Sequence, residues 1–229
     1  MGNKFARPIS AGDSMVKLIN EEYNILPILS RFSIPLGFGS KTIGEVCDEA
    51  CINTDTFLLI VNFTLSGTIP PHINNKSNAL GIIEFLHNSH DYFLGYKFPH
   101  IRNNLLSAVD ESHSEINPAI IHFFDEYVRQ VKQHFDYEEQ NVWPYIKSLV
   151  DGTPSTDYNI AVFKSHHDEI GEKLSDLKNI ILRYYTTTKP NLMYDVLVDI
   201  YNCEADLNSH NEIENEILIP MISELEGIS

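Results

Sequence analysis

The segment HFDYEEQNVWP, residues His134–Pro144, recurs 76 residues later as HNEIENEILIP, residues His210–Pro220. Both copies follow the pattern His-x3-Glu-x5-Pro, with two large apolar residues directly before the proline. In a helix, residues four apart lie on one face, about one turn from each other. Each copy therefore presents an imidazole and a carboxylate side by side, and the repeat predicts two halves of one metal site on two helices.

The alternative is that these are surface helices with incidental histidines and glutamates. A third His-x3-Glu pair, His122 with Glu126, illustrates the risk, because a chain with ten histidines produces such a match by chance. This third pair has Lys132 where the repeated copies have proline. The shared proline and its apolar neighbours favour a metal site for the two copies and make His122 a decoy.

Composition and charge exclude several classes of protein. The formal net charge is -16 and the pI is about 4.9, which argues against nucleic acid or an anionic membrane as a partner. The longest apolar run, at 57–61, is too short to span a bilayer, and the N-terminal residues form no apolar signal region. Three cysteines make no disulfide framework. We expect a cytoplasmic protein, and the sequence leaves its oligomeric state open.

Helical periodicity organises the chain into two parts. Residues 1–75 predict short helices separated by breakers, with Thr42 as one helix cap, and TIPPHINN at 68–75 predicts a domain boundary. Residues 76–229 contain long helical patterns at 77–110, 118–149, 156–185 and 190–225, the first with an expected kink at Pro99. The predicted fold is all-α: an antiparallel up-down four-helix bundle at 76–229, preceded by a small helical N-terminal domain at 1–75.

The other two long helices must complete the metal site. On the third, His167 shares the apolar face of Phe163 and Leu174, whereas His166 lies about 100 degrees around the helix. On the first, His90 shares an apolar face, and His87, one turn earlier, is expected to support it or to face solvent. The predicted ligands are His90, His134, Glu138, His167, His210 and Glu214.

This donor set selects among metals. It has too many ligands for one tetrahedral zinc and is too rich in nitrogen for calcium or magnesium. Divided between two metals, it gives each two histidines, with two carboxylates able to bridge. We therefore expect a centre of two Fe ions with an oxo or hydroxo bridge, for which Mn or Zn could substitute.

These residues carry a family resemblance. The motifs SHDYF at 89–93, HFDYEEQNVWP at 134–144, HHDEIGEKL at 166–174 and HNEIENEILIP at 210–220 resemble a hemerythrin-like (HHE cation-binding) domain. Within that group the chain looks most like the repair of iron centres proteins, the di-iron proteins of iron–sulphur cluster repair. The resemblance implies four terminal histidine ligands and bridging carboxylates at Glu138 and Glu214.

Three departures from related proteins bear on function. The stretch IPLGFGS at 34–40 stands where the repair of iron centres family has a Cys-Cys pair followed by glycines. Oxygen-carrying hemerythrins have His-x4-Asp where this chain has Asn215, and His-x3-His where it has Gly171. One fewer histidine leaves metal positions for water, dioxygen or nitric oxide.

The resemblance implies a cytoplasmic non-haem di-iron protein of the oxidative and nitrosative stress response, which helps repair iron–sulphur clusters and is expected to donate iron. Its implied partners are iron–sulphur proteins or apo-cluster acceptors. The alternatives are binding or sensing of dioxygen or nitric oxide, and a di-iron oxidoreductase that reduces nitric oxide or peroxide. Sequence cannot separate them, because all three use the same site.

Overall fold

The computed structural model describes residues 7–67, 69, 75–110, 115–153, 158–166 and 172–227. Over these residues the chain is helical and has no strand, although Ser14 and Thr42 form an isolated bridge pair. The all-α fold expected from periodicity is confirmed. Within the same ranges, no helix combines the length and the apolarity needed to cross a bilayer.

The chain folds into two compact units. The first comprises Met1–Ser89, Tyr145–Ala161 and Glu212–Ser229, and the second comprises His90–Pro144 and Val162–Asn211. The two units are defined by which residues contact one another. The domain boundary expected after residue 75 concerns which part of the chain folds on its own, so that boundary stays a prediction.

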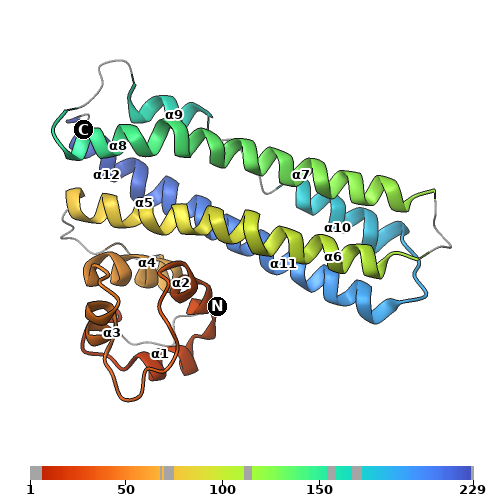
Figure 1. Ribbon diagram of the computed structural model, residues 1–229, viewed down its shortest axis with the longest axis horizontal. Helices are drawn as coiled ribbons and strands as arrows, with labels where there is room; N and C mark the ends of the chain where they lie inside the picture. Colours follow the sequence, from red (N-terminus) through yellow and green to blue (C-terminus); the bar gives the residue numbers. More distant parts are fainter. Residues whose placement is uncertain are drawn as a thin grey trace. The chain divides into compact units, whose positions relative to one another are not determined.

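Short helices open the first unit (Figure 1): α1 (Met15–Glu21), the 3₁₀ turn η1 (Tyr23–Ile25), α2 (Leu26–Arg31), α3 (Ile43–Glu49) and α4 (Thr54–Ser66). Polar side chains cap them, because the first backbone N–H groups of a helix have no partner inside it. Thr42 caps α3, as predicted, and forms a reciprocal capping box with Glu45. Gly67 ends α4 in the left-handed conformation, with φ 67.

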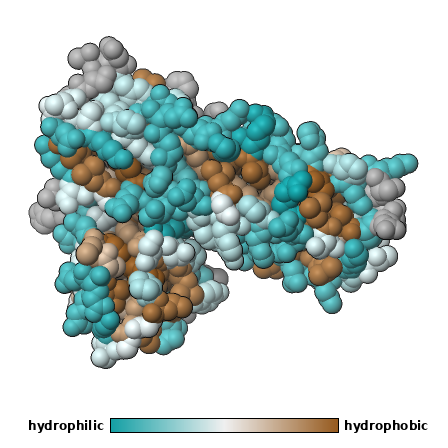
Figure 2. All heavy atoms as spheres, in the orientation of Figure 1, coloured by the Kyte–Doolittle hydropathy of each residue, from teal (hydrophilic) through white to brown (hydrophobic). Residues whose placement is uncertain are grey.

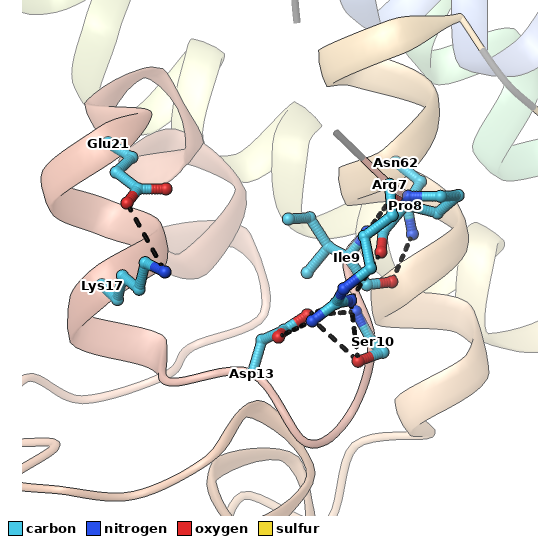
Figure 3. Close-up of polar contacts among 8 residues, drawn as sticks. All are labelled: Arg7, Pro8, Ile9, Ser10, Asp13, Lys17, Glu21 and Asn62. Atoms are coloured by element: carbon cyan, nitrogen blue, oxygen red, sulfur yellow. Dashed lines mark hydrogen bonds and ion pairs between the residues drawn. The ribbon is translucent and has the colours of Figure 1, made fainter. Parts of the chain in front are cut away.

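Polar contacts hold the segment before α1 (Figure 3). The Asp13 carboxylate accepts hydrogen bonds from the Arg7 guanidinium at 3.0 Å and from the Ser10 backbone N–H at 2.8 Å. The buried Asn62 side chain accepts from the Ile9 N–H at 2.7 Å and donates to the Ile9 carbonyl at 3.0 Å. These bonds anchor the segment to α4, the helix that carries Asn62.

The first unit also contains α5 (Asn75–Tyr92), which approaches α4 closely. A Cβ added at Gly81 would lie 2.8 Å from Thr56 Oγ1, so only glycine permits this approach. Thr56 Oγ1 in turn donates to Asn78 Oδ1 at 2.8 Å. Close packing thus fixes α5, whose last turn carries His90.

In the second unit, four helical segments lie alongside one another (Figure 1). They are formed by the π turn η2 (Phe93–Lys97) with α6 (Phe98–Ala108), by α7 (Asn117–Tyr137) with the π turn η4 (Glu138–Val142), by α10 (Glu172–Tyr184) and by α11 (Pro190–Ile213). All four contribute buried apolar side chains to one core, among them Leu105, Phe124, Leu177 and Ile200. The remaining elements are α8 (Trp143–Val150), α9 (Ile160–His166), the π turn η5 (Glu214–Leu218) and α12 (Ile219–Leu225).

A proline follows each π turn. Pro99, Pro144 and Pro220 are the second residues of α6, α8 and α12. Proline has no N–H, and its ring clashes with the carbonyl four residues earlier, so a regular α-helical turn cannot continue through it. The π turns avoid this conflict: the Trp143 N–H, for example, bonds to the Glu138 carbonyl five residues back.

The long helices predicted from periodicity pass through these turns. The residues on both sides of η2 keep α-helical dihedral angles, so the expected effect of Pro99 takes the form of a π turn and the helix continues. The pattern at 156–185 appears as α9 and α10, and residues 167–171 between them lie outside the described part of the chain.

Hydrophilic side chains cover much of the face seen in Figure 2, with hydrophobic patches between them. Large apolar side chains are exposed along α11 at Tyr194, Val198 and Tyr201. In contrast, His90 and His210 are buried and belong to a polar cluster between the helices.

Candidate metal centre

Four buried side chains from three long helices form a compact polar cluster. His90 lies in the last turn of α5, Glu138 begins η4, His210 lies in the last turn of α11, and Glu214 begins η5 one turn later. One ligand atom from each lies within 4.8 Å of the others, and all four residues are buried. Two imidazoles and two carboxylates at this separation could hold a metal ion.

Glu138 is the centre of this arrangement. Its Oε2 lies 3.1 Å from His90 Nε2, and its Oε1 lies 3.1 Å from His134 Nε2. The side chain of Glu138 is fully buried. A single buried carboxylate therefore faces two imidazoles, one through each oxygen.

His90 shows why this contact fits a metal better than a hydrogen bond. Its Nδ1 lies 2.8 Å from Glu139 Oε1, whereas its buried Nε2 makes no hydrogen bond although Glu138 Oε2 is near. An ionised carboxylate only accepts, so Nδ1 donates to Glu139, and in the neutral tautomer, the form that can ligate a metal, Nε2 then carries a lone pair. In that tautomer Nε2 and Glu138 Oε2 are two acceptors 3.1 Å apart, an arrangement that a shared metal cation would stabilise.

The cluster's charge supports the same reading. Glu138 and Glu214 are both buried at 0% exposure. Two carboxylates brought together away from water are costly to keep ionised unless a positive charge compensates them. A metal cation bound between them and the two imidazoles would supply that charge.

Aromatic side chains surround the histidine rings. His90 stacks on Phe135 with ring centroids 3.9 Å apart, and Trp143 lies on a nearly parallel plane 6.0 Å away. Phe93 meets His210 edge-on at 6.2 Å. These rings restrict the orientation of the imidazoles and keep water away from the cluster.

The structure places the other predicted residues differently. The His134 side chain is 10% exposed, its Nε2 is buried, and it contacts Glu138 from outside the four-residue group. His167 lies outside the described residues, as does the side chain of His166. His87 is exposed, which leaves His90 as the histidine that α5 contributes to the cluster.

The decoy pair is not part of this centre. His122 is exposed, and Glu126 accepts hydrogen bonds from Arg129 and Gln130. These contacts hold the pKa of the Glu126 carboxyl well below its usual range, at about 2, chiefly through the Arg129 guanidinium. That His122 is dispensable for metal binding stays a prediction from the missing proline.

Sequence reasoning missed the contact between Glu139 and His90. Glu139 directly follows Glu138 and was not assigned a contact, yet it bonds to His90 on another helix. The signal available in the sequence was the adjacent pair of carboxylates within the repeated motif, since metal-bound histidines commonly donate their second N–H to a carboxylate.

Comparison with protein families identifies the domain that contains the cluster. The hemerythrin HHE cation binding domain matches residues 81–222, which is more than half of the chain and includes every predicted ligand. No curated protein matches the chain, and no solved structure does. The helical fold, the buried His/Glu cluster and this match agree, and the chain belongs to the hemerythrin HHE cation-binding domain family.

Proposed function

We propose that this protein is a non-haem di-iron protein of the oxidative and nitrosative stress response that helps repair iron–sulphur clusters. The observation that carries the di-iron part is the two-sided contact of Glu138 with His90 and His134. A buried carboxylate whose two oxygens each face an imidazole is suited to bridge two cations. It is less suited to complete the coordination of a single cation.

Two metal positions follow from this contact. His90, His210 and Glu214 form one compact group with Glu138, and His134 lies at the Glu138 oxygen that does not face His90. We assign the first position to His90 and His210, and the second to His134 together with His167, whose place on the helix comes from the sequence alone. Each position then has two imidazoles and access to a carboxylate.

Iron is the metal that we assign. Imidazole and carboxylate donors together suit iron and manganese, and paired Glu and His residues inside a helical bundle are the ligand type of di-iron carboxylate proteins. Bound iron would supply one-electron chemistry and an exchangeable metal. The protein's own residues bind the cations, orient the ligands through the aromatic contacts and exclude water from His90 and His210.

The repair role rests on the resemblance to the repair of iron centres proteins. As an iron donor, the protein would act in the cytoplasm on iron–sulphur proteins that have lost metal, and apo-cluster acceptors would be its partners.

A second candidate is reversible binding or sensing of dioxygen or nitric oxide. It is favoured by the ligand set, because Gly171 stands where oxygen-carrying hemerythrins supply another histidine. The bound irons would then keep positions for a small ligand. An oxidoreductase that reduces nitric oxide or peroxide would use the same positions.

Metal analysis of protein purified aerobically tests the site. We expect two irons per chain and a visible charge-transfer band, whereas a single tightly held zinc would overturn the di-iron proposal. Incubation of the iron-loaded protein with an apo-cluster acceptor then tests the role. Iron transfer supports repair, a stable nitric oxide or dioxygen adduct without transfer supports the binder, and turnover with an electron donor supports the enzyme.

A further inference from the structure

The second ring nitrogen of His90 lies outside the ligand cluster and contacts Glu139 instead. We propose that Glu139 is a positioning residue of the metal site, which holds the His90 imidazole with Nε2 directed at the metal. This inference rests on the proposed function, because it concerns the same site.

Two consecutive glutamates contact the two nitrogens of one ring. Glu138 Oε2 lies 3.1 Å from Nε2, and Glu139 Oε1 lies 2.8 Å from Nδ1. Both glutamates belong to the π turn η4, which begins at Glu138. A neutral imidazole has a single N–H, so it cannot donate to both carboxylates. Only the contact at Nδ1 has hydrogen-bond geometry, so we take Nδ1 as the donor and Nε2 as the nitrogen available to a metal.

Stacking alone does not select this orientation. The Phe135 ring lies 3.9 Å from the His90 ring, with the planes 15° apart, and therefore fixes the plane of the imidazole. A half-turn of the imidazole within its own site keeps that plane and the stack, but it exchanges each ring nitrogen with a carbon. The hydrogen bond to Glu139 is the contact that distinguishes the two orientations.

The environment makes this bond effective. The His90 side chain is 4% exposed, whereas that of Glu139 is 32% exposed. Glu139 thus reaches a buried ring from near the surface, where its charge costs little to maintain. A carboxylate that accepts from a ligating histidine also makes the other nitrogen a stronger donor to the metal.

The test uses Co²⁺ as the probe, because its visible spectrum reports coordination. Glu139→Ala is expected to lower Co²⁺ affinity about 10- to 100-fold, the range typical for loss of such a supporting contact. Glu139→Gln should lie between this variant and the wild type, since an amide oxygen still accepts from Nδ1–H. Asp136→Asn is the matched control: it removes one negative charge from the same helix at a residue bound to Lys132, and its affinity should stay within about twofold.

Two further measurements separate positioning from a general structural effect. In the Co²⁺-loaded protein, the exchangeable Nδ1–H resonance of His90 should exchange faster with solvent in Glu139→Ala than in Asp136→Asn. In a His90→Ala background, Glu139→Ala should no longer affect affinity, because Glu139 acts through that ring.

The outcomes distinguish this proposal from the one on which it rests. Failure of the wild-type protein to bind Co²⁺ would overturn the metal site itself. Wild-type binding with unchanged affinity in Glu139→Ala, or an equal loss in the presence and absence of His90, would overturn only the positioning role.

Discussion

The imidazole of His90 stacks on the phenyl ring of Phe135, with centroids 3.9 Å apart and planes 15° apart. Phe135 directly follows His134 on α7, and its own ring is 1% exposed. The same turn of α7 therefore carries one proposed ligand and the surface against which a ligand from α5 packs. This links helix packing to the geometry of the site.

Replacement of Phe135 tests that link. Phe135→Leu removes the stacking surface and leaves space beside the ring, so we expect a loss of about 1–2 kcal/mol in unfolding free energy and weaker Co²⁺ binding. Phe124→Leu is the matched control, because Phe124 is equally buried in the same helix but has no ring contact with His90. Urea unfolding should show similar losses for both variants, and Co²⁺ titration should separate them. Equal affinities would show that the stack does not support the ligand.

The exposed histidines should be dispensable. His87→Ala and His122→Ala each remove an exposed imidazole, so we expect unchanged iron content and a change of less than about 0.5 kcal/mol in stability. Metal analysis after purification under identical conditions measures this directly. A protein depleted of iron by His87→Ala would show that α5 contributes a different histidine from the one assigned.

The pairing of Arg7 with Asp13 predicts a pH dependence. The Arg7 hydrogen bond lowers the pKa of the Asp13 carboxyl to about 2, below its value of about 3.9 in an unfolded chain. A lowered pKa in the folded state means that the contact stabilises the fold above pH ~4 and that this contribution is lost between pH ~4 and ~2. Because Arg7 is largely exposed, solvent screens the pair and the effect should be small. Urea midpoints of the wild type and Asp13→Asn should differ at pH 7 and converge as the pH approaches 2. A difference that grows on acidification would contradict this sign.

Much of the fold could be read from local patterns. Apolar residues at helical spacing predicted the long helices, and the proline after each repeated motif marked the ends of η4 and η5. The His-x3-Glu spacing also placed His134 beside Glu138, because this contact depends only on one helical turn. Local geometry therefore sufficed wherever both partners belong to one helix.

The contacts between helices could not be read in the same way. Periodicity assumes a regular α-helix, but η4 begins at Glu138 and changes which residues face inward after it. Whether Glu139 points to solvent or to His90 depends on the position of α5, which no short motif encodes. The sequence accordingly identified Glu138, one turn after His134, and missed the contact of Glu139.

Glu138 supplies the sharpest prediction for the centre. Its oxygens face His90 and His134, so Glu138→Ala would remove one donor from each proposed metal position and leave two cations less shielded from each other. We expect iron to fall at both positions, whereas His134→Ala should leave about one iron per chain, held on the side of His90 and His210.

Glu138→Gln separates this role from packing, because it keeps the shape and removes the charge. Without metal, loss of a fully buried carboxylate should leave the protein as stable as the wild type or more stable. With metal, the order should reverse, because only the wild type gains the full free energy of binding. Iron analysis and thermal unfolding with and without Fe²⁺ measure both effects. Two irons per chain in Glu138→Ala would refute the bridging role, and a metal-free Glu138→Gln protein that is less stable than the wild type would show that the carboxylate serves the fold rather than the metal.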